Sequence, residues 1–556
     1  MLWLIVAAAL VFFMQAGFAM VEAGFTRAKN AGNIVMKNTL DFVFATIVYV
    51  AIGYSLAYGS DIAGIIGSPS FFLSGFEGEY TSVLFQLVFA GATATIVSGA
   101  MAERTKFSSY MIYAVVICAF VYPVVTHWVW GSGGWLVEWG YHDFAGSTAV
   151  HMVGGIAALV GAFFLGPRIG KYDKDGTVHA IPGHNLTLAA LGVFILWFGW
   201  FGFNGGSTLA VSGYDGAASA DFTSQVLIVT CMAAAAGAFF AMLTSIALFK
   251  KPDVSFTLNG CLAGLVAICA GADVVDFYGA FAIGAVAGVF VVIGADFVDR
   301  KLKIDDPVGA FAVHGISGMV GILLVAFFDT GSGLFYGGGM DALTQLGKQT
   351  AGMLVIAGWT VLTMGATFYA IKKTIGLRVS PEEELEGLDL SEHGLSNAYS
   401  GLMPDNQKIT LADETATPMA AGAETMPGIP VYDYTVPAAC TLKKVVIITR
   451  REMLGALKSQ MDGLGISGMT ISYVEGFGAQ KGHAQTYRGV HVDSTLLPKM
   501  KAEIVVSKIP VQDVVEAAKR AIYTGAVGDG KIFIYDVENA FRIRTGQSGA
   551  DAVSAE

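Results

Sequence analysis

The chain has 556 residues, of which 54% are hydrophobic and only 14% are charged. A soluble globular protein is usually about 25% charged, so the composition predicts an integral membrane protein with more than one domain. The 70 glycines fit membrane helices, in which glycine lets backbones approach closely. The formal net charge of −11 argues against nucleic acid as a partner. The five cysteines have no metal-ligand spacing, and we expect free thiols rather than a disulfide framework.

Residues 1–373 contain eleven apolar stretches long enough to cross a bilayer. We place them at 2–20, 38–58, 82–101, 108–127, 147–166, 184–203, 222–246, 256–271, 276–296, 309–328 and 349–371. Lysine and arginine gather in every second loop, beginning with Arg27 after the first stretch, and such an excess marks cytoplasmic loops. We therefore expect the N-terminus outside a bacterial-type inner (plasma) membrane, and everything after the last stretch in the cytoplasm.

Three further segments follow the membrane part. Residues 374–400 form an acidic cytoplasmic tail, and residues 401–441 have the composition of a linker. Residues 442–556 alternate between strand-like and helix-like runs in the order βαββαβ, with a projecting loop between 476 and 499. The predicted fold class is a polytopic α-helical membrane protein with eleven transmembrane helices, joined to a cytoplasmic α+β ferredoxin-like domain.

A nine-residue pattern occurs twice in the membrane part. Residues 143–151 and 306–314 each begin with Asp, continue with Gly three residues later, and end in Ala-Val-His. Five predicted spans separate the copies, which predicts a 5+5 inverted repeat, because an odd number of spans reverses the second half in the bilayer. Inverted-repeat transporters hold their substrate path at the repeat interface. We therefore expect His151 and His314 to meet near the midplane.

Two other interpretations of the paired histidines remain open. Each imidazole could simply form a hydrogen bond to a neighbouring helix, although the duplicated motif disfavours this. A metal site would need further nitrogen, sulfur or carboxylate ligands, and no Cys or Glu cluster at ligand spacing accompanies either histidine.

Aromatic residues gather at the outer ends of the same helices. Most of them, including Trp197 and Trp200, are expected in the interfacial belt of a membrane protein. A cluster on one side also suits a small cation, which ring faces attract by about 0.5–2 kcal/mol. Two imidazoles in an apolar pore then indicate that the cation loses a proton as it crosses the membrane, since moving the neutral form through an apolar region costs far less free energy.

Six stretches of the membrane part carry a family resemblance: Met20–Asn30, Gly99–Arg104, Asp143–His151, Gly199–Asn204, Asp305–Gly315 and Glu386–Tyr399. Together they resemble the Amt/MEP/Rh ammonium transporters over essentially all of residues 1–400. The resemblance implies a homotrimer with one pore in each subunit. It also implies an outer ammonium site formed by Phe89, Trp130 and Ser207, and a phenyl gate formed by Phe89 and Phe203. His151 and His314 would form a twin-histidine pair, and Asp143 would support the outer site structurally.

Five stretches of the C-terminal part carry a second resemblance: Gly476–His483, Tyr487–Gly489, Leu497–Lys499, Thr524–Lys531 and Arg542–Gly546. They resemble the PII nitrogen-regulatory proteins, soluble trimers that bind and close such transporters. The resemblance implies ATP or ADP bound by Gly476, Gly478, Lys499, Glu503, Gly528, Asp529, Gly530, Lys531, Arg542 and Arg544. It also implies that Gln480 ligates Mg²⁺ together with ATP and 2-oxoglutarate, and that Arg488 plugs the cytoplasmic mouth of the pore.

Two departures from the PII pattern modify these expectations. Ala479 stands where many PII proteins have an arginine that touches nucleotide phosphates, which leaves the nucleotide preference open. Val492 and Val490 stand at positions that are covalently modified in two branches of the PII family. We therefore expect this domain to be controlled by bound ligands and not by covalent modification.

The sequence thus predicts an ammonium transporter whose tethered PII-like domain gates the pore in response to adenine nucleotide. The alternative is an ammonium sensor with weak transport that signals through the C-terminal domain. We expect no enzyme and no catalytic cofactor, because neither a Ser/His/Asp set nor a carboxylate pair lies near the stretches that resemble phosphate sites.

Overall fold

The computed structural model describes residues 1–211, 220–395, 398, 442–466, 468–476, 484–487, 490–493, 497–525 and 528–553. Their contacts divide the chain into two compact units, Met1–Ala398 and Tyr399–Glu556. The predicted linker, residues 401–441, lies outside the described residues together with Cys440. The other four cysteines are free thiols.

Ten helical segments within the described part of the first unit are long and apolar enough to cross a membrane. They are Leu2–Phe25, Ala28–Tyr58, Tyr80–Ala100, Phe107–Trp139, Ser147–Leu165, Leu186–Gly206, Ala220–Phe249, Phe277–Leu302, Phe311–Phe328 and Gly339–Thr374. The remaining predicted span, 256–271, corresponds to a helix of 15 residues, Val254–Ile268. At 1.5 Å per residue such a helix is about 22 Å long, shorter than the hydrocarbon core of about 30 Å. Eleven complete spans therefore stay a prediction.

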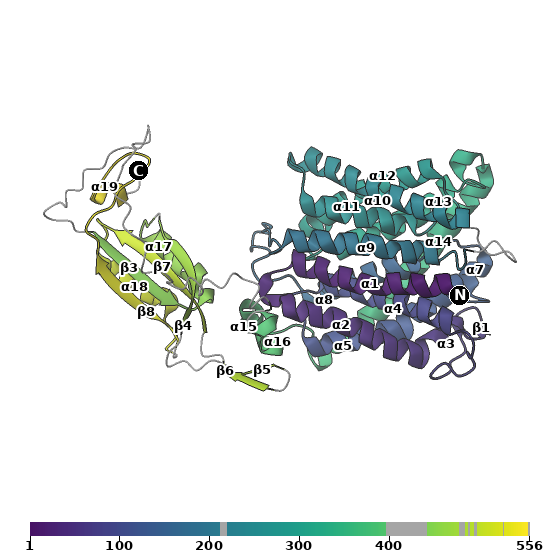
Figure 1. The fold of residues 1–556 in the computed structure, drawn as a ribbon, viewed down its shortest axis with the longest axis horizontal. Helices are drawn as coiled ribbons and strands as arrows, with labels where there is room; N and C mark the ends of the chain where they lie inside the picture. Colours follow the sequence, from purple (N-terminus) through teal and green to yellow (C-terminus); the bar gives the residue numbers. More distant parts are fainter. Residues whose placement is uncertain are drawn as a thin grey trace, which may run out of the picture. The chain divides into compact units, whose positions relative to one another are not determined.

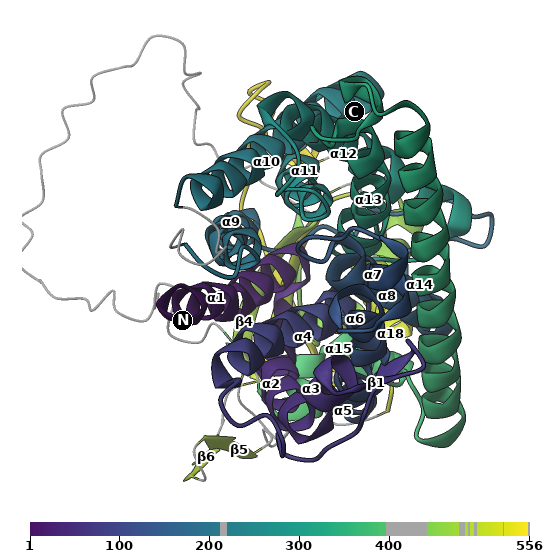
Figure 2. The ribbon, with the colours of Figure 1, turned by 90° about the vertical axis from the view of Figure 1, so that its right-hand side faces the viewer.

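The helices of the first unit run side by side along a common direction (Figure 1), and the long helix α14 lies along one side of the bundle (Figure 2). The elements up to residue 152 are α1 (Leu2–Phe25), η1 (Ala28–Asn30), α2 (Ala31–Val48), η2 (Tyr49–Gly53), α3 (Tyr54–Tyr58), β1 (Asp61–Ile62), β2 (Ile66–Gly67), α4 (Tyr80–Ala100), α5 (Phe107–Val116), η3 (Ile117–Val121), α6 (Tyr122–Trp130), α7 (Trp135–Trp139) and η4 (Ser147–Met152). Those that follow are α8 (Val153–Leu165), α9 (Leu186–Gly206), α10 (Ala220–Phe249), α11 (Val254–Ile268), α12 (Phe277–Phe297), η5 (Val298–Leu302), η6 (Phe311–Ile316), α13 (Ser317–Phe328), η7 (Leu334–Tyr336), α14 (Gly339–Thr374), α15 (Pro381–Glu386) and α16 (Leu388–His393).

Glycine sets the close approach of α1 to α9, which are far apart in the sequence but pack along each other. A Cβ added to Gly202 would lie 2.5 Å from the carbonyl oxygen of Ala7, and one added to Gly192 would lie 2.6 Å from that of Gly17. Such contacts allow only glycine. They bring the aromatic residues near the end of α9 into the interior of the unit.

The second unit contains a four-stranded antiparallel sheet in the order β4-β7-β3-β8. Its elements are β3 (Lys443–Thr449), η9 (Arg451–Met453), α17 (Leu454–Gly463), β4 (Thr470–Gly476), β7 (Leu497–Val506), α18 (Val511–Ile522), β8 (Lys531–Asp536) and α19 (Ala550–Val553). The core joins Val445 and Ile504 of the sheet to Leu457 and Val514 of the two helices. The predicted βαββαβ order is confirmed.

The segment 476–499 differs from the projecting loop that the sequence predicts. It contains two short strands, β5 (Ala484–Tyr487) and β6 (Val490–Asp493), that pair antiparallel with Tyr487 opposite Val490. The β-branched and aromatic residues in both strands favour this pairing, and the two residues between them include a glycine that suits a tight turn. The structure therefore adds a short hairpin within the segment that the sequence predicts as a projecting loop.

Candidate functional site

His151 and His314 meet in the interior of the first unit. Their Nδ1 atoms lie 3.3 Å apart, and their rings are nearly parallel with centroids 5.3 Å apart. Both imidazoles are buried. A hydrogen bond between the two Nδ1 atoms requires one ring to donate and the other to accept. The Nε2 atom of His151 has no partner among the described residues, which leaves a ring nitrogen for a guest molecule.

The duplicated sequence pattern adopts the same local structure twice. In the first copy, the Asp143 carboxylate accepts hydrogen bonds from the backbone N–H groups of Ser147 and Thr148, both at 2.8 Å. In the second copy, the Asp306 carboxylate accepts from the N–H of Phe311 at 2.8 Å. Each aspartate is followed by a glycine with positive φ, 99° at position 146 and 78° at position 309. The result is a capped π-helical turn, η4 or η6, that carries the histidine.

A stacked pair of phenyl rings lies next to the histidines. The rings of Phe89 and Phe203 have centroids 4.0 Å apart and an interplanar angle of 17°. The Phe203 ring is in turn 5.1 Å from His151, and the Trp200 ring stacks on His151 at 5.2 Å. The rings therefore form a continuous column from Phe89 to His314. Trp200 is fully buried in this column and is therefore not one of the aromatic residues of the interfacial belt.

The three residues expected at the outer site lie at the other end of this column. The Trp130 ring is 6.2 Å from Phe89, and its indole N–H donates to the backbone oxygen of Asp143 at 2.7 Å. Ser207 follows Phe203 by one helical turn, and its hydroxyl donates to the Phe203 carbonyl at 2.8 Å. The Asp143 carboxylate accepts hydrogen bonds from the backbone N–H groups at the start of η4. Asp143 therefore fixes the position of Trp130 through its backbone.

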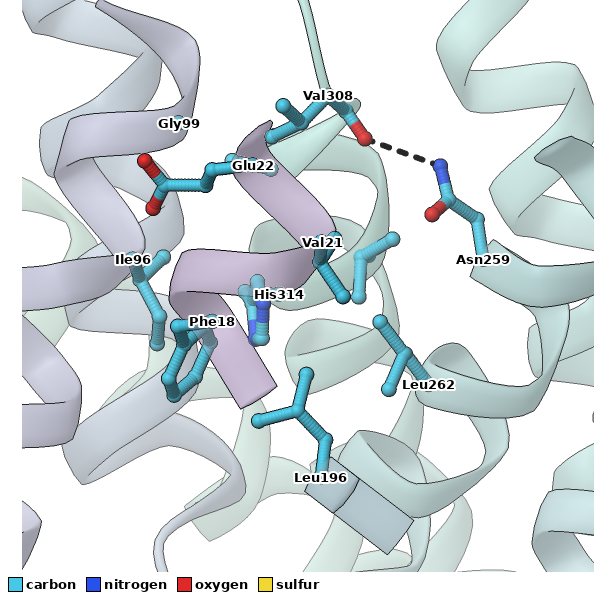
Figure 3. Close-up of a pocket in the computed structure, with 12 residues that line it drawn as sticks. Phe18, Val21, Glu22, Ile96, Gly99, Leu196, Asn259, Leu262, Val308 and His314 are labelled. Carbon is cyan, nitrogen blue, oxygen red and sulfur yellow. Dashed lines mark hydrogen bonds between the residues drawn. The ribbon is translucent and has the colours of Figure 1, made fainter. Parts of the chain in front are cut away.

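A cavity of about 20 Å³ is lined by His314 (Figure 3). Apolar side chains make up most of its wall, among them Phe18 and Leu196, together with the carboxylate residue Glu22. This volume accommodates about one molecule of the size of water or ammonia. At its edge, the Asn259 amide donates to the Val308 carbonyl at 3.0 Å. Phe18 was not predicted as a site residue, because a phenylalanine on a long apolar helix carries no signal of its own.

A larger cavity of about 450 Å³ shares Asn259 and Val308 with the small one. Charged residues of both signs line it, including Arg168, Lys171, Asp253 and Asp299. These residues lie in or beside loops that the charge pattern places on the cytoplasmic side. The two cavities therefore share a wall at Asn259 and Val308.

A buried ion network at the same end was not predicted from the sequence. The Arg168 guanidinium donates to both oxygens of Asp305, at 2.8 and 2.9 Å, and to Glu103 at 2.9 Å. Glu103 also pairs with Arg27, and Arg104 donates to the Asp305 backbone oxygen at 2.7 Å. Burial alone would raise the pKa of Asp305, but Arg104 and Arg168 hold that pKa well below its usual range. Burial lowers the pKa of Arg104 to about 10.

The second unit brings together part of the predicted nucleotide site. The Asp529 carboxylate accepts from the N–H groups of Thr524 and Gly525, at 2.7 and 2.9 Å, and from Arg450 at 2.8 Å. The Thr524 hydroxyl and N–H lower the pKa of Asp529. The Lys499 ammonium donates to the Gly528 carbonyl at 3.4 Å. Arg450 was not predicted from the sequence, and only its contact with Asp529 reveals it.

The remaining predicted nucleotide residues are more scattered. Glu503 forms ion pairs with Lys444 at 2.6 Å and Lys501 at 3.4 Å. Gly476 and Lys531 lie at the ends of β4 and β8, and Arg542 donates to Gln547 at 2.9 Å. Gly530, with a φ of 114°, approaches the Ile448 carbonyl so closely that a Cβ would lie 2.0 Å from it. Arg544 follows two residues after Arg542, whereas Gly478, Gln480 and Arg488 lie outside the described residues.

Comparison with known families and proteins identifies two homologous regions. A model of the Ammonium Transporter Family matches residues 2–398, and a model of Nitrogen regulatory protein P-II matches residues 442–547. The chain is 43% identical over 435 residues to Ammonium transporter Amt2 of Archaeoglobus fulgidus, covering 74% of this chain and 90% of that relative. It is also 43% identical over 413 residues to Ammonium transporter Amt1 of Haloferax mediterranei, covering 71% of this chain and 78% of the relative.

Solved structures resemble the first unit. A structure titled Sensor Amt Protein aligns with a TM-score of 0.66 and 41% identity, covering 70% of this chain and 97% of that chain. Mep2 of Candida albicans aligns with a TM-score of 0.62 and 28% identity, covering 69% of this chain and 86% of that chain.

Proposed function

The chain belongs to the ammonium transporter family and carries a C-terminal P-II domain, and from this premise we propose that it transports ammonium under the control of that domain. The substrate is recognised at Phe89, Trp130 and Ser207 and passes the phenyl pair. It then crosses the histidines as ammonia. The family is one of transporters and not of enzymes.

The observation that carries the proposal is the alignment of rings with the histidine pair. Phe89 and Phe203 stack at 4.0 Å, Phe203 lies 5.1 Å from His151, and the His151 Nδ1 is 3.3 Å from the Nδ1 of His314. An ammonium ion would lose its hydration in this column, because the rings replace few of its hydrogen bonds. Neutral ammonia avoids the cost of burying a charge and can exchange hydrogen bonds with ring nitrogens.

The proposed assembly is a homotrimer with its N-terminus outside and its P-II domain in the cytoplasm. In this proposal, ATP or ADP binds the P-II domain, 2-oxoglutarate and Mg²⁺ join through Gln480, and Arg488 closes the pore. A guanidinium carries donors on a planar, bulky head and cannot pass as a substrate. Tethering also raises the effective concentration of a weak inhibitor to about the millimolar range.

The tail that precedes the linker is packed against the membrane part, and this supports a mechanical connection. The Asp389 carboxylate accepts from the N–H groups of Gly32 and Asn33, at 3.0 and 2.7 Å, at the start of α2. The Lys29 ammonium donates to the carbonyls of Glu384 and Leu385 at 2.6 and 2.7 Å. A pull on residues after 398 would therefore act on α2, a helix of the transport unit.

The proposal is tested by currents on a solid-supported membrane after an ammonium jump. We compare the full chain with a truncation after Tyr399, each with and without ATP, ADP and 2-oxoglutarate. The full chain is expected to give currents that depend on these ligands, and the truncation to give currents that do not. Equal ligand dependence in both forms would contradict gating by the P-II domain. Silence in both would require a vesicle pH assay for electroneutral ammonia passage.

Nucleotide binding has a separate test in the loop around Asp529. We expect Asp529→Ala to weaken ATP binding to the full-length protein by at least about tenfold, because this carboxylate fixes the loop through the N–H groups of Thr524 and Gly525. Two glycines with positive φ, Gly528 and Gly530, give that loop the open backbone of a phosphate cradle. Isothermal titration measures the affinity. Asp462→Ala, on α17, serves as the control, and equal affinity in both variants would remove Asp529 from the site.

One observation supports the alternative function of a sensor. The structure titled Sensor Amt Protein matches this chain at 41% identity over 97% of that protein's own chain. If the chain is chiefly a sensor, ammonium will change the nucleotide affinity of the P-II domain while transport stays weak. The same titrations, repeated with and without ammonium, distinguish this function from gated transport.

A further inference from the structure

Asn259 of α11 lies in the wall shared by the two cavities of the first unit, and it is buried, with 8% of its surface exposed. Among the described residues, Asn259 and Val308 are the two that line both cavities. The small cavity contains His314 in a mostly apolar wall, whereas charged residues such as Lys171 and Asp299 line the large one. A polar side chain therefore stands between an apolar chamber and a charged one.

The hydrogen bond of the Asn259 amide fixes its orientation. The Nδ2 atom donates to the Val308 carbonyl oxygen at 3.0 Å. Because a carbonyl oxygen can only accept, the amide nitrogen must face Val308 and the amide oxygen Oδ1 must point away from it, as Figure 3 shows. Within the described ranges, no residue donates a hydrogen bond to Oδ1. One amide oxygen at the edge of the small cavity is therefore left for a guest molecule.

The Val308 carbonyl is held in place by the second copy of the repeat. The Asp306 carboxylate accepts from the N–H groups of Gly309 at 3.0 Å and Phe311 at 2.8 Å, which fixes the turn that contains Val308. The Val308 side chain also packs against α4, because a Cβ added to Gly99 would lie 2.4 Å from its Cγ2 atom. The amide that binds this carbonyl is positioned together with the turn.

The first copy of the repeat holds a side chain in the same way. There the Trp130 indole N–H donates to the Asp143 carbonyl at 2.7 Å, just as Asn259 donates to a carbonyl of the second copy. Trp130 adjoins Phe89 at the start of the ring column, whereas Asn259 lines the cavity at His314, where the column ends. Each copy of the repeat therefore positions one side chain at its own end of the column.

The other polar groups of the small cavity already have partners. One oxygen of the Glu22 carboxylate accepts from the Ser98 hydroxyl, and the other accepts from the Asn38 amide at 3.1 Å. The Nδ1 atom of His314 is paired with the other histidine. Apolar residues make up the rest of the wall. A molecule that leaves the histidines therefore meets its next unpartnered acceptor at Asn259.

We propose that Asn259 is the inner counterpart of the outer ammonium site, and that its amide oxygen accepts a hydrogen bond from the substrate as it passes from the histidine pair to the charged cavity. This inference rests on the proposed transport function. Ammonia has N–H groups that find no acceptor on the apolar wall, and it donates one of them to Oδ1. A neutral amide suits a site of release, because it accepts from ammonia and ammonium alike. A carboxylate forms hydrogen bonds to cations that are about twice as strong, and it would retain ammonium.

The proposal is tested by comparing transport from the two faces of the membrane. Initial rates with ¹⁵N-labelled ammonium are measured in right-side-out and inside-out membrane vesicles that contain the full-length protein. We expect Asn259→Leu to raise the half-saturating ammonium concentration at the cytoplasmic face by about three- to tenfold, the usual effect of one lost hydrogen bond, and to change the value at the outer face by less than about twofold. Thr257→Val, on the same helix, is the control, since the Thr257 hydroxyl bonds to the Asp253 carbonyl at 2.7 Å and lines neither cavity.

A second variant separates substrate binding from the structural role of the contact with Val308. Aspartic acid has the size of asparagine and keeps a side-chain oxygen, and its neutral carboxyl can still donate to the Val308 carbonyl. Asn259→Asp is therefore expected to keep or lower the half-saturating concentration at the cytoplasmic face. A rise as large as that in Asn259→Leu would leave Asn259 with a structural role alone, and an unchanged value in Asn259→Leu would show that substrate does not bind there. Either result overturns the proposal, as does an equal rise at both faces.

A binding measurement does not depend on transport. Infrared difference spectra are recorded with and without ammonium on the full-length protein, with its asparagines ¹³C-labelled at the side-chain carbonyl. We expect ammonium to shift one of these carbonyl bands to lower frequency, in the unmodified protein and in Thr257→Val but not in Asn259→Leu. A band that does not shift, or that shifts equally in Asn259→Leu, overturns the proposal. If the vesicles show no transport, the proposed transport function fails, and the infrared spectra still decide the inner site.

Discussion

Replacing His151 by leucine is expected to lower the rate of ammonium transport by on the order of 10- to 100-fold, because an unsatisfied buried donor or acceptor costs about 1–3 kcal/mol. Leucine keeps the bulk of the ring and its packing between Trp200 and Phe203. It removes the Nδ1 that meets His314 and the Nε2 that has no other partner among the described residues. Ammonia in the column would then lose its hydrogen bonds at the narrowest apolar point.

The measurement is the initial uptake of ¹⁵N-labelled ammonium into proteoliposomes, with the elution volume of the purified variant as a check on folding. His179→Leu is the matched control, since that imidazole is about half exposed and pairs with Asp173 at 2.7 Å outside the column. We expect the control to transport like the unmodified chain. Equal rates for His151→Leu and the control would show that substrate does not pass the histidine pair.

The histidine pair could be predicted because each copy of the repeat contains its own positioning device. The aspartate that caps the turn, the glycine with positive φ and the histidine lie within nine residues of one another. Interactions between residues so close in the chain can be predicted from the sequence. The strands and helices of the P-II domain were predictable for a similar reason, since each is marked by its own short apolar run, although β3 and β7 pair across distant parts of the sequence.

Other parts of the site depend on packing between distant segments and leave no local pattern. Trp200 resembles an interfacial tryptophan in sequence, and only the close contact of α9 with α1 shows that it faces His151. Arg450 and Asp529 lie 79 residues apart, and their contact follows from the sheet topology.

Removing Arg168 from the buried ion network is expected to destabilise the membrane unit strongly, because it leaves buried carboxylates without one of their partners. We expect Arg168→Met to destabilise the folded unit by about 3–5 kcal/mol, the usual cost of removing one partner from a buried ion pair. Asp305 and Glu103 would each keep a buried charge and lose one guanidinium partner. The measurement is thermal unfolding in detergent, followed by tryptophan fluorescence, in comparison with Arg300→Met. Arg300 pairs with Asp296 at 2.6 Å but is 60% exposed, so its loss should cost no more than about 1 kcal/mol.

The dependence on pH identifies the carboxylates as the cause of this effect. The pKa of Asp305 lies below its usual range in the folded chain, and so does that of Glu103, where Arg168 and Arg27 outweigh burial. A carboxylate with a depressed pKa stabilises the fold above its unfolded pKa, about 4, and this contribution is lost as the pH falls below that value. The gap in unfolding temperature between the unmodified chain and Arg168→Met should therefore be constant from pH 8 to about pH 5 and shrink in stronger acid. A gap that stayed the same down to about pH 3 would assign the loss to the packing of the Arg168 side chain rather than to its charge.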